Sequence, residues 1–229
     1  MRDTAPPPGE LTSFVVSEEI TVSARLLAPK SARACYVLAH GAGAGMDHPA
    51  MHAIALGLAD LGVATLRYQF PYMERGSRRP DSPPLCHATV RAAVAVAARL
   101  APGLKLIAGG RSFGGRMTSQ AQSIEPLAGV RGLAFLGFPL HPAGQPSDKR
   151  AAHLASVAIP MLFLSGTRDA LAERSLLEAL IARLGARATL SLIEDADHSW
   201  HVPAKSGRKD AAVLGEALAR LAAWSEALG

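Results

Sequence analysis

The amino-acid sequence predicts an α/β protein with a mostly parallel sheet of eight strands and helices on both faces. Short β-rich runs alternate with longer helical patterns, which is typical of a parallel sheet covered by helices. The length of 229 residues suits one large domain better than two. Hydrophobic residues make up 49% of the chain and charged residues 19%, which excludes disordered, collagen-like and coiled-coil proteins. We therefore expect a single domain over residues 1–229, with a flexible, proline-containing stretch at residues 1–10.

The first two strands are expected to form an antiparallel hairpin. Residues 12–16 and 20–27 show strand-like alternation of apolar and polar side chains, and a short polar turn separates them. The six later runs are more uniformly apolar, as expected for strands that are buried on both faces of a sheet. We expect these strands at residues 34–39, 63–67, 104–108, 132–138, 161–165 and 188–193.

Helical patterns lie between the later strands, and several of them end at Gly or Pro. We expect helices at residues 49–61, 85–100, 113–124, 171–184 and 210–228. The segment 139–159, after the sixth strand, has room for only one short helix, so we expect a minimal cap or none and a shallow, open pocket. An open parallel sheet carries its chemistry in the loops beyond the carboxyl ends of its strands, and the candidate residues are found there.

A GxSxG string at residues 110–114 follows the expected strand 104–108 and leads into the expected helix 113–124. In this strand–turn–helix context, Gly110 and Gly114 allow the strand and helix to approach each other while the hydroxyl of Ser112 projects outward. The first amides of the helix have no partner inside it, so the Phe113 N–H is the first candidate oxyanion donor. The alternative, a phosphate-binding turn, lacks both the GxxxxGK[ST] and the GxGxxG patterns. Ser112 is the candidate nucleophile.

A serine nucleophile needs a base, and the base needs a group that holds its tautomer. Asp169 follows the seventh expected strand and His198 follows the eighth, which gives the chain order Ser, Asp, His. His201 competes as the base, and Asp195 and Asp197 compete as the acid. Asp169 is favoured because the acid should come from a different loop than the histidine to reach the far ring nitrogen.

A glycine-rich loop, HGAGAG at residues 40–45, follows the third expected strand. Its glycines allow the backbone to bend back over the site, where a main-chain N–H can serve as the second oxyanion donor. Ala42 is the preferred donor and Gly41 the alternative. His40 leads the loop, and we expect it to brace the loop by hydrogen bonding rather than to act in catalysis.

These three motifs together resemble the α/β-hydrolase superfamily, and the resemblance covers nearly the whole chain. The chain is most similar to the dienelactone-hydrolase-like proteins and, within them, to the KANL-type hydrolases, which are related to a subunit of a histone-acetyltransferase complex. The strings LRYQFPY at residues 66–72 and FPLHP at residues 138–142 indicate this closer kinship. The resemblance implies the α/β-hydrolase fold and a serine-hydrolase mechanism.

Two functions are compatible with these motifs and with the resemblance. The first is a serine hydrolase, of carboxylesterase or thioesterase type, that cleaves a small ester or thioester through an acyl-enzyme and needs no cofactor. The second is a non-catalytic interaction protein that retains the scaffold without its chemistry, as the kinship to a complex subunit would permit. All three residue types of a catalytic triad are present, which favours the enzyme.

Several side chains near the expected strand ends are candidates for binding the substrate. Arg67 and Arg111 are suited to hold an anionic group, although acidic residues share the loop after Arg67 and a solvated mixed-charge loop is the alternative. His141 and Trp200 follow strand ends and either line the pocket or pack as ordinary core residues. Gly41 belongs to the same candidate set.

We expect a small-molecule substrate as the only partner, because the sequence lacks the features of the other classes. The formal net charge is +5 and no stripe of Lys and Arg is present, so we expect no nucleic-acid partner. No apolar run is long enough to cross a bilayer. Cys35 and Cys86 lack a CxxC spacing, and we expect free thiols in a cytoplasmic protein. His48 and His52 lack the Glu of a zinc-protease motif, so we expect no metal.

Overall fold

The computed structural model describes residues 8–229, in which eight strands form one sheet. The strand order is β1-β2-β4-β3-β5-β6-β7-β8, with antiparallel pairing of β1 to β2 and of β2 to β4 and parallel pairing elsewhere. The predicted hairpin and the mostly parallel sheet are confirmed. The strands are β1 (Glu10–Ser17), β2 (Ile20–Leu27), β3 (Ala34–Ala39), β4 (Val63–Tyr68), β5 (Lys105–Arg111), β6 (Val130–Leu136), β7 (Met161–Gly166) and β8 (Ala188–Ile193). Of the stretch expected to be flexible, residues 1–7 lie outside the described residues.

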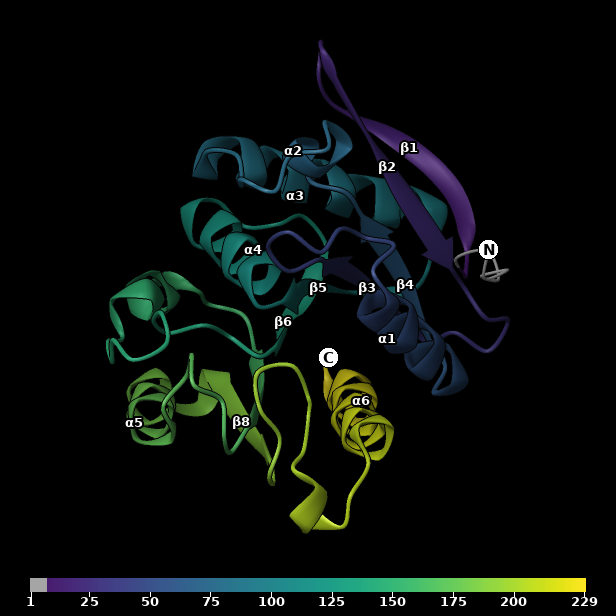
Figure 1. Ribbon diagram of the computed structural model, residues 1–229. Coiled ribbons are helices and arrows are strands. Elements are labelled where there is room, and N and C mark those ends of the chain that lie inside the picture. Colours follow the sequence, from purple (N-terminus) through teal and green to yellow (C-terminus); the bar gives the residue numbers. More distant parts are fainter. Residues whose placement is uncertain (1–7) are drawn as a thin grey trace.

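Helices cover both faces of this sheet, as predicted (Figure 1). Helices α1 and α6 pack on one face, and α3, α4 and α5 pack on the other with the short helix η1. Side chains of β3 alternate between the two layers: Tyr36 and Leu38 join the α1 and α6 side, whereas Cys35 and Val37 join the other. The helices are α1 (Pro49–Asp60), α2 (Pro71–Glu74), α3 (Pro83–Leu100), α4 (Phe113–Ile124), α5 (Arg174–Leu184) and α6 (Asp210–Ala227), with 3₁₀ turns η1 (Lys149–Ser156), η2 (Gly185–Arg187) and η3 (Ala204–Ser206).

Several boundaries differ from the sequence prediction by one to three residues, and three of these differences lie at the candidate site. Strand β5 continues through Gly109 and Gly110, which pair with β3. Position 109 requires glycine, since a Cβ there would lie only 1.9 Å from the carbonyl oxygen of Ala134 in β6. Strand β6 ends before Gly137, whose positive φ of 74° is incompatible with extended backbone. Helix α5 begins three residues later than expected, after a turn that Asp169 stabilises. The short helix α2 was not predicted.

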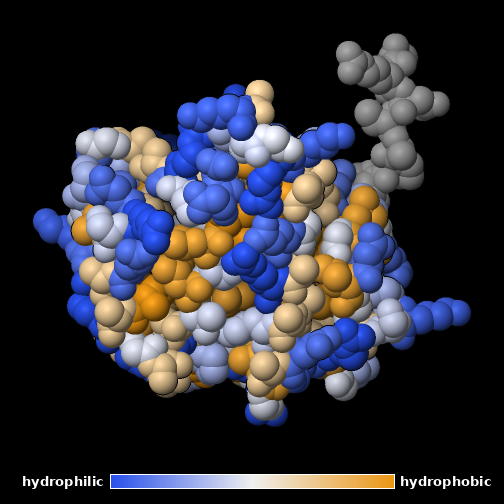
Figure 2. All heavy atoms as spheres, turned by 90° about the horizontal axis from the view of Figure 1, so that it is seen from below, coloured by the Kyte–Doolittle hydropathy of each residue, from blue (hydrophilic) through white to orange (hydrophobic). Residues whose placement is uncertain are grey.

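The segment between β6 and β7 contains only η1 as a helix, in agreement with the expected minimal cap. Hydrophobic side chains gather in the middle of the face seen from below, and hydrophilic side chains frame them (Figure 2). Within residues 8–229, no helix combines the length and the apolar character that a membrane span requires.

Candidate active site

Ser112 occupies the sharp turn between β5 and α4. Its φ of 49° and ψ of −115° lie outside the regions that a non-glycine residue normally adopts. Strand β5 and helix α4 both approach the end of β3 so closely that a Cβ at Gly110 would lie 2.3 Å from the carbonyl oxygen of Ala39, and one at Gly114 would lie 2.6 Å from that of His40. The two glycines flanking the Ser112 turn are therefore sterically required, although the close neighbour is the end of β3 rather than the strand and helix themselves.

The structure brings Ser112, His198 and Asp169 into one hydrogen-bonded row. The Nε2 atom of His198 lies 2.8 Å from the Ser112 Oγ, and its Nδ1 atom lies 2.8 Å from the Asp169 Oδ2. With Nδ1 protonated, the ring donates to the carboxylate and accepts from the hydroxyl. The Asp169 side chain is fully buried, whereas that of His198 is 19% exposed. This arrangement has the connectivity of a nucleophile, a base and an orienting acid.

Asp169 is fixed by contacts between the loops that follow β7 and β8. Its second oxygen, Oδ1, accepts the Leu171 N–H at 2.8 Å, which orients the carboxylate. The Arg168 N–H donates to the carbonyl oxygen of Ala196 at 2.9 Å, and a Cβ at Gly166 would lie 2.0 Å from that same oxygen. The acid and histidine loops therefore form one packed unit, which sets the distance between Asp169 and the imidazole.

The competing acidic and histidine residues shape the histidine loop instead. The Oδ1 atom of Asp197 accepts the N–H groups of Ser199 at 2.7 Å and His201 at 2.9 Å. The exposed His201 ring pairs with Asp210 at 3.0 Å, which raises its pKa. The Asp195 N–H donates to the Thr167 Oγ1 at 2.9 Å. None of these four contacts involves Ser112 or His198.

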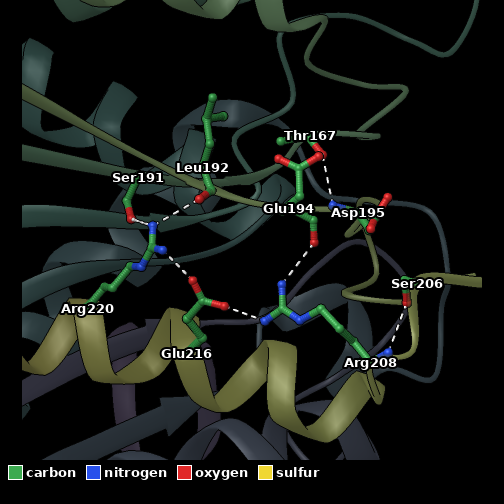
Figure 3. A network of polar contacts seen from close by, with 9 residues as sticks. All are labelled: Thr167, Ser191, Leu192, Glu194, Asp195, Ser206, Arg208, Glu216 and Arg220. Carbon is green, nitrogen blue, oxygen red and sulfur yellow. Dashed lines mark hydrogen bonds and ion pairs between the residues drawn. The ribbon is translucent and has the colours of Figure 1, made fainter.

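A polar network anchors the start of the histidine loop to α6 (Figure 3). Glu216 pairs with both Arg208 and Arg220. Arg208 Nη1 donates to the carbonyl oxygen of Glu194 at 3.2 Å, and Arg220 Nη1 donates to the Ser191 Oγ at 2.8 Å. Because Glu194 directly follows β8, the network ties the strand end and the first loop residue to one helix.

The glycine-rich loop adjoins the Ser112 turn. A Cβ at Gly41 would lie 3.9 Å from the Ser112 Cβ, so this residue borders the serine directly. The Ala44 N–H donates to the Gly41 carbonyl oxygen at 3.3 Å and closes a turn that leaves Ala42 exposed at its centre. Phe113 is the first residue of α4, where an amide has no acceptor within the helix.

His40 braces this loop, as the sequence analysis expected. Its Nδ1 atom lies 2.8 Å from the Gly41 carbonyl oxygen, and its Nε2 atom accepts the Phe70 N–H at 3.1 Å. The residue is fully buried, and burial lowers the pKa of the ring to about 4. His40 is therefore neutral near pH 7, and both ring nitrogens are engaged with the backbone.

Among the predicted binding residues, Arg67 and Arg111 differ in their surroundings. The buried Arg67 guanidinium donates to the carbonyl oxygens of Met46, at 3.1 Å, and Pro8, and burial lowers its pKa to about 10. Arg67 therefore supports the backbone beneath the glycine-rich loop, and we leave it out of the proposed site. The half-buried Arg111 lies beside Ser112 in sequence, and its Nη2 lies 3.3 Å from the Ser199 Oγ in the histidine loop.

His141 and Trp200 lie in packed surroundings. The buried His141 ring contacts the Pro142 carbonyl oxygen at 2.8 Å and accepts the Glu173 N–H at 3.4 Å, so it joins the segment after β6 to the start of α5. Trp200 belongs to the core cluster beneath α1 and α6. The packing alternative that the sequence left open accounts for both residues, and we leave both out of the proposed site.

Gly137 is a site residue that sequence reasoning missed. A Cβ at this position would lie 3.2 Å from the His198 Cε1 and 3.7 Å from the Asp169 Oδ2, and its φ is 74°. Gly137 therefore leaves the space in which the histidine and carboxylate meet. A glycine directly after an apolar run, here in the string GFP at residues 137–139, is the signal that could have indicated it.

The two thiols are unsuited to nucleophilic chemistry. Cys35 and Cys86 are free and buried, and burial raises the pKa of each thiol to about 12. Within the described range 8–229, no three His, Cys, Asp or Glu side chains gather in a way that could hold a metal ion.

Comparison with known proteins agrees with the fold. The family model described as "Alpha/beta hydrolase domain" matches residues 32–226. Dienelactone hydrolase from Anabaena variabilis has a similar structure, with a TM-score of 0.77 and 21% identity over 97% of this chain and 98% of that one. Est1E from Butyrivibrio proteoclasticus has a TM-score of 0.71 and 16% identity over 95% of this chain and 99% of that one. An α/β serine hydrolase without lid from Xanthomonas campestris has a TM-score of 0.70 and 16% identity over 95% of this chain and 96% of that one.

Proposed function

Since this chain belongs to the alpha/beta hydrolase domain family, we propose that it is a serine hydrolase that cleaves a small ester or thioester. The single observation that carries the proposal is the hydrogen-bonded row from the Ser112 Oγ through the His198 ring to the Asp169 carboxylate, with both contacts at 2.8 Å. This row couples a weakly nucleophilic hydroxyl to a base that is held in one tautomer.

In the proposed first step, the Ser112 Oγ attacks the carbonyl carbon of the substrate and its proton passes to the His198 Nε2. The Asp169 carboxylate stabilises the imidazolium that forms. The carbonyl oxygen becomes an oxyanion, which the N–H groups of Phe113 and Ala42 stabilise. The tetrahedral intermediate then collapses, the bond to the alcohol or thiol breaks, and the Nε2 proton passes to the leaving group.

In the second step, water replaces the leaving group. His198 Nε2 takes a proton from the water, the resulting hydroxide attacks the acyl-enzyme carbonyl, and collapse returns the proton to the Ser112 Oγ. The carboxylic acid product leaves and the resting row is restored. Each role in this cycle is filled by a side chain or backbone amide of this chain, and the proposed cycle uses no cofactor.

We propose a small or partly polar acyl group for this enzyme. Between β6 and β7 the described chain provides only the eight-residue helix η1, too little for a large lid over the Ser112 hydroxyl. A similar structure is described as a serine hydrolase without lid. We further propose that the chain groups with the dienelactone-hydrolase-like proteins and their KANL-type members, on the strings at residues 66–72 and 138–142.

A fluorophosphonate probe tests the proposed nucleophile. The probe should label the wild-type protein, and labelling should vanish in Ser112→Ala. Ser199→Ala is the matched control, because this hydroxyl lies one residue after His198 and should leave labelling intact. A panel of short esters, thioesters and lactones then identifies the substrate class. Absence of labelling in the wild type, together with no turnover of the panel, would contradict the proposal and favour a non-catalytic scaffold.

A further inference from the structure

Two arginines near the Ser112 turn have no counter-charge. Arg116 lies in α4 and Arg150 in η1, and both are half-buried. Among residues 8–229, no oxygen accepts a hydrogen bond from either guanidinium, and the Arg116 Nε is fully enclosed without a partner. By contrast, the half-buried Arg91 is satisfied, because its Nη2 donates to the carbonyl oxygens of Ala121 at 2.6 Å and Glu125 at 2.9 Å. An unpaired, partly desolvated guanidinium is costly, and here two such groups repel each other.

The Arg116 side chain reaches toward the nucleophile. Side chains of an α-helix point back toward its N-terminus, and the Arg116 Cζ lies 5.8 Å from the centre of the Phe113 ring, one turn earlier. The Arg116 N–H also donates to the Ser112 carbonyl oxygen at 3.1 Å. Four residues of helix rise separate the two α-carbons by roughly 6 Å along the axis. The guanidinium therefore lies within the reach of a substrate that is bound at Ser112.

The groups around Arg116 do not neutralise it. His153 of η1 contacts the Ser119 Oγ at 2.8 Å, and His87 of α3 contacts the Gln120 Oε1 at 3.2 Å, so both rings contact α4 about one turn after Arg116. Burial and the Arg116 charge lower the pKa of both rings, that of His153 to about 4. Both rings are neutral near pH 7 and supply no negative charge.

The acidic residues of the neighbouring segments pair with other arginines. Asp148 pairs with Arg183 at 2.6 Å, and Glu125 pairs with Arg91 at 3.4 Å. The positive charges of Arg116 and Arg150 therefore remain uncompensated, and that of Arg116 lies next to the half-buried Phe113 ring. A planar guanidinium binds carboxylate or phosphate oxygens through paired N–H donors, so an oxyanion would satisfy the free donors and relieve the repulsion.

We propose that Arg116 and Arg150 form a subsite for a carboxylate or phosphate group of the substrate, one helical turn from Ser112. This inference rests on the proposed hydrolase function and narrows its substrate class to anionic esters or thioesters. The apolar part of such a substrate would lie against Phe113, between the scissile carbonyl at Ser112 and the anionic group at the two arginines.

Paired ester substrates test the subsite. The 4-nitrophenyl hemiester of glutaric acid and 4-nitrophenyl valerate have acyl chains of equal length and differ in a terminal carboxylate. The wild-type kcat/KM should be higher for the hemiester. Arg116→Gln and Arg150→Gln should each lower the ratio of the two kcat/KM values by about tenfold to hundredfold, the size expected for a lost charge-assisted hydrogen bond. Comparing 4-carboxyphenyl acetate with phenyl acetate tests an anion in the leaving group.

Arg33→Gln is the matched control, because Arg33 is an exposed arginine that pairs with Glu226 and precedes β3, at the opposite end of this strand from the glycine-rich loop. It should leave both kcat/KM values and their ratio unchanged. Thermal unfolding of each variant separates a lost subsite from a lost fold. Ratios that stay at the wild-type value in both folded variants, for both ester pairs, would overturn the subsite.

A binding measurement separates this inference from the proposed function. Calorimetric titration of the Ser112→Ala protein with glutarate, and separately with inorganic phosphate, should show binding of at least one anion that weakens about tenfold or more when Arg116→Gln is added. Such binding without turnover of any ester would retain the subsite and contradict the hydrolase. Turnover of neutral esters, with neither anion bound and no preference for the anionic esters, would retain the hydrolase and contradict the subsite.

Discussion

His40 and His198 are the same side chain at equivalent places, each in the loop beyond the carboxyl end of a strand, yet their surroundings differ. Both rings have contacts at both nitrogens. His40 is fully buried and contacts only backbone groups, the Gly41 carbonyl oxygen and the Phe70 N–H. His198 is partly exposed and joins a carboxylate to a hydroxyl. Only the surroundings of His198 offer a proton donor, the Ser112 hydroxyl, and a group that stabilises the charged ring, the Asp169 carboxylate.

This difference shows that neighbouring groups, rather than residue type, decide what a histidine can do. A ring held between an amide and a carbonyl in an apolar interior is restricted to one neutral state, which makes it a rigid structural support. A ring between Ser112 and Asp169 can accept a proton and remain stabilised as a cation. The same contrast predicts that the two histidines respond differently to substitution.

The largest expected effect is on turnover when the proposed base is removed. His198→Gln should lower kcat by roughly 10⁶-fold, since a triad acts as a unit, while leaving the fold intact. His201→Gln, three residues further along, is the matched control and should retain wild-type kcat, because that ring faces Asp210 and solvent. Steady-state kinetics on the best ester of the panel measures both. Equal losses of kcat in His198→Gln and His201→Gln would contradict the role of His198 as the base.

The acid is expected to contribute less than the base. Asp169→Asn preserves the shape of the side chain but favours the wrong imidazole tautomer, and kcat should fall by roughly 10⁴-fold. The control Asp197→Asn retains an oxygen that can accept the N–H groups of Ser199 and His201, so it should stay within a few-fold of wild type. Wild-type turnover in Asp169→Asn would remove Asp169 from the proposed triad.

Gly137 tests how closely the His198 environment is packed. Gly137→Ala places a methyl 3.2 Å from the His198 Cε1, and displacement of the ring should lower kcat/KM by about 10²-fold. Gly144→Ala is a matched control, because Gly144 has a similar φ of 71° but nothing within 4 Å of an added Cβ. Both variants carry the same backbone strain. If both lose activity equally, the strain rather than the crowding is responsible.

His40 is expected to affect stability rather than chemistry. His40→Phe leaves the Gly41 carbonyl and the Phe70 N–H unpaired, which should lower the free energy of unfolding by about 2 kcal/mol at pH 7. The His40 pKa is about 4 in the folded state against 6.5 for the free ring, so the unfolded chain binds the proton first as the pH falls.

The stability of the wild type should therefore decline between pH 6.5 and pH 4, by up to about 1.4 kcal/mol per pH unit from this ring. His40→Phe should decline less steeply, while His153, whose pKa is also lowered to about 4, contributes equally to both proteins. Urea unfolding at pH 7, 6 and 5 gives the two slopes. Identical slopes would show that His40 is not held neutral.

The sequence alone determined the fold class and the chain order of the candidate triad, because both depend on local patterns. Apolar runs define strands buried on both faces, and the glycines around Ser112 report a turn that no other residue could occupy. Asp169 and His198 were predicted because they directly follow strands whose carboxyl ends share one edge of the sheet.

The tertiary structure decided the contacts that no periodicity encodes. Arg67 lies near the end of a strand, and His141 and Trp200 follow strand ends as the triad residues do. Only packing shows that their side chains contact backbone groups or the core. The roles of Gly137 and of the unpaired Arg116 likewise depend on groups that are distant in sequence. The physical reason is that hydrogen bonding, burial and charge pairing depend on which segments meet in space, whereas a sequence pattern reports only what each segment does by itself.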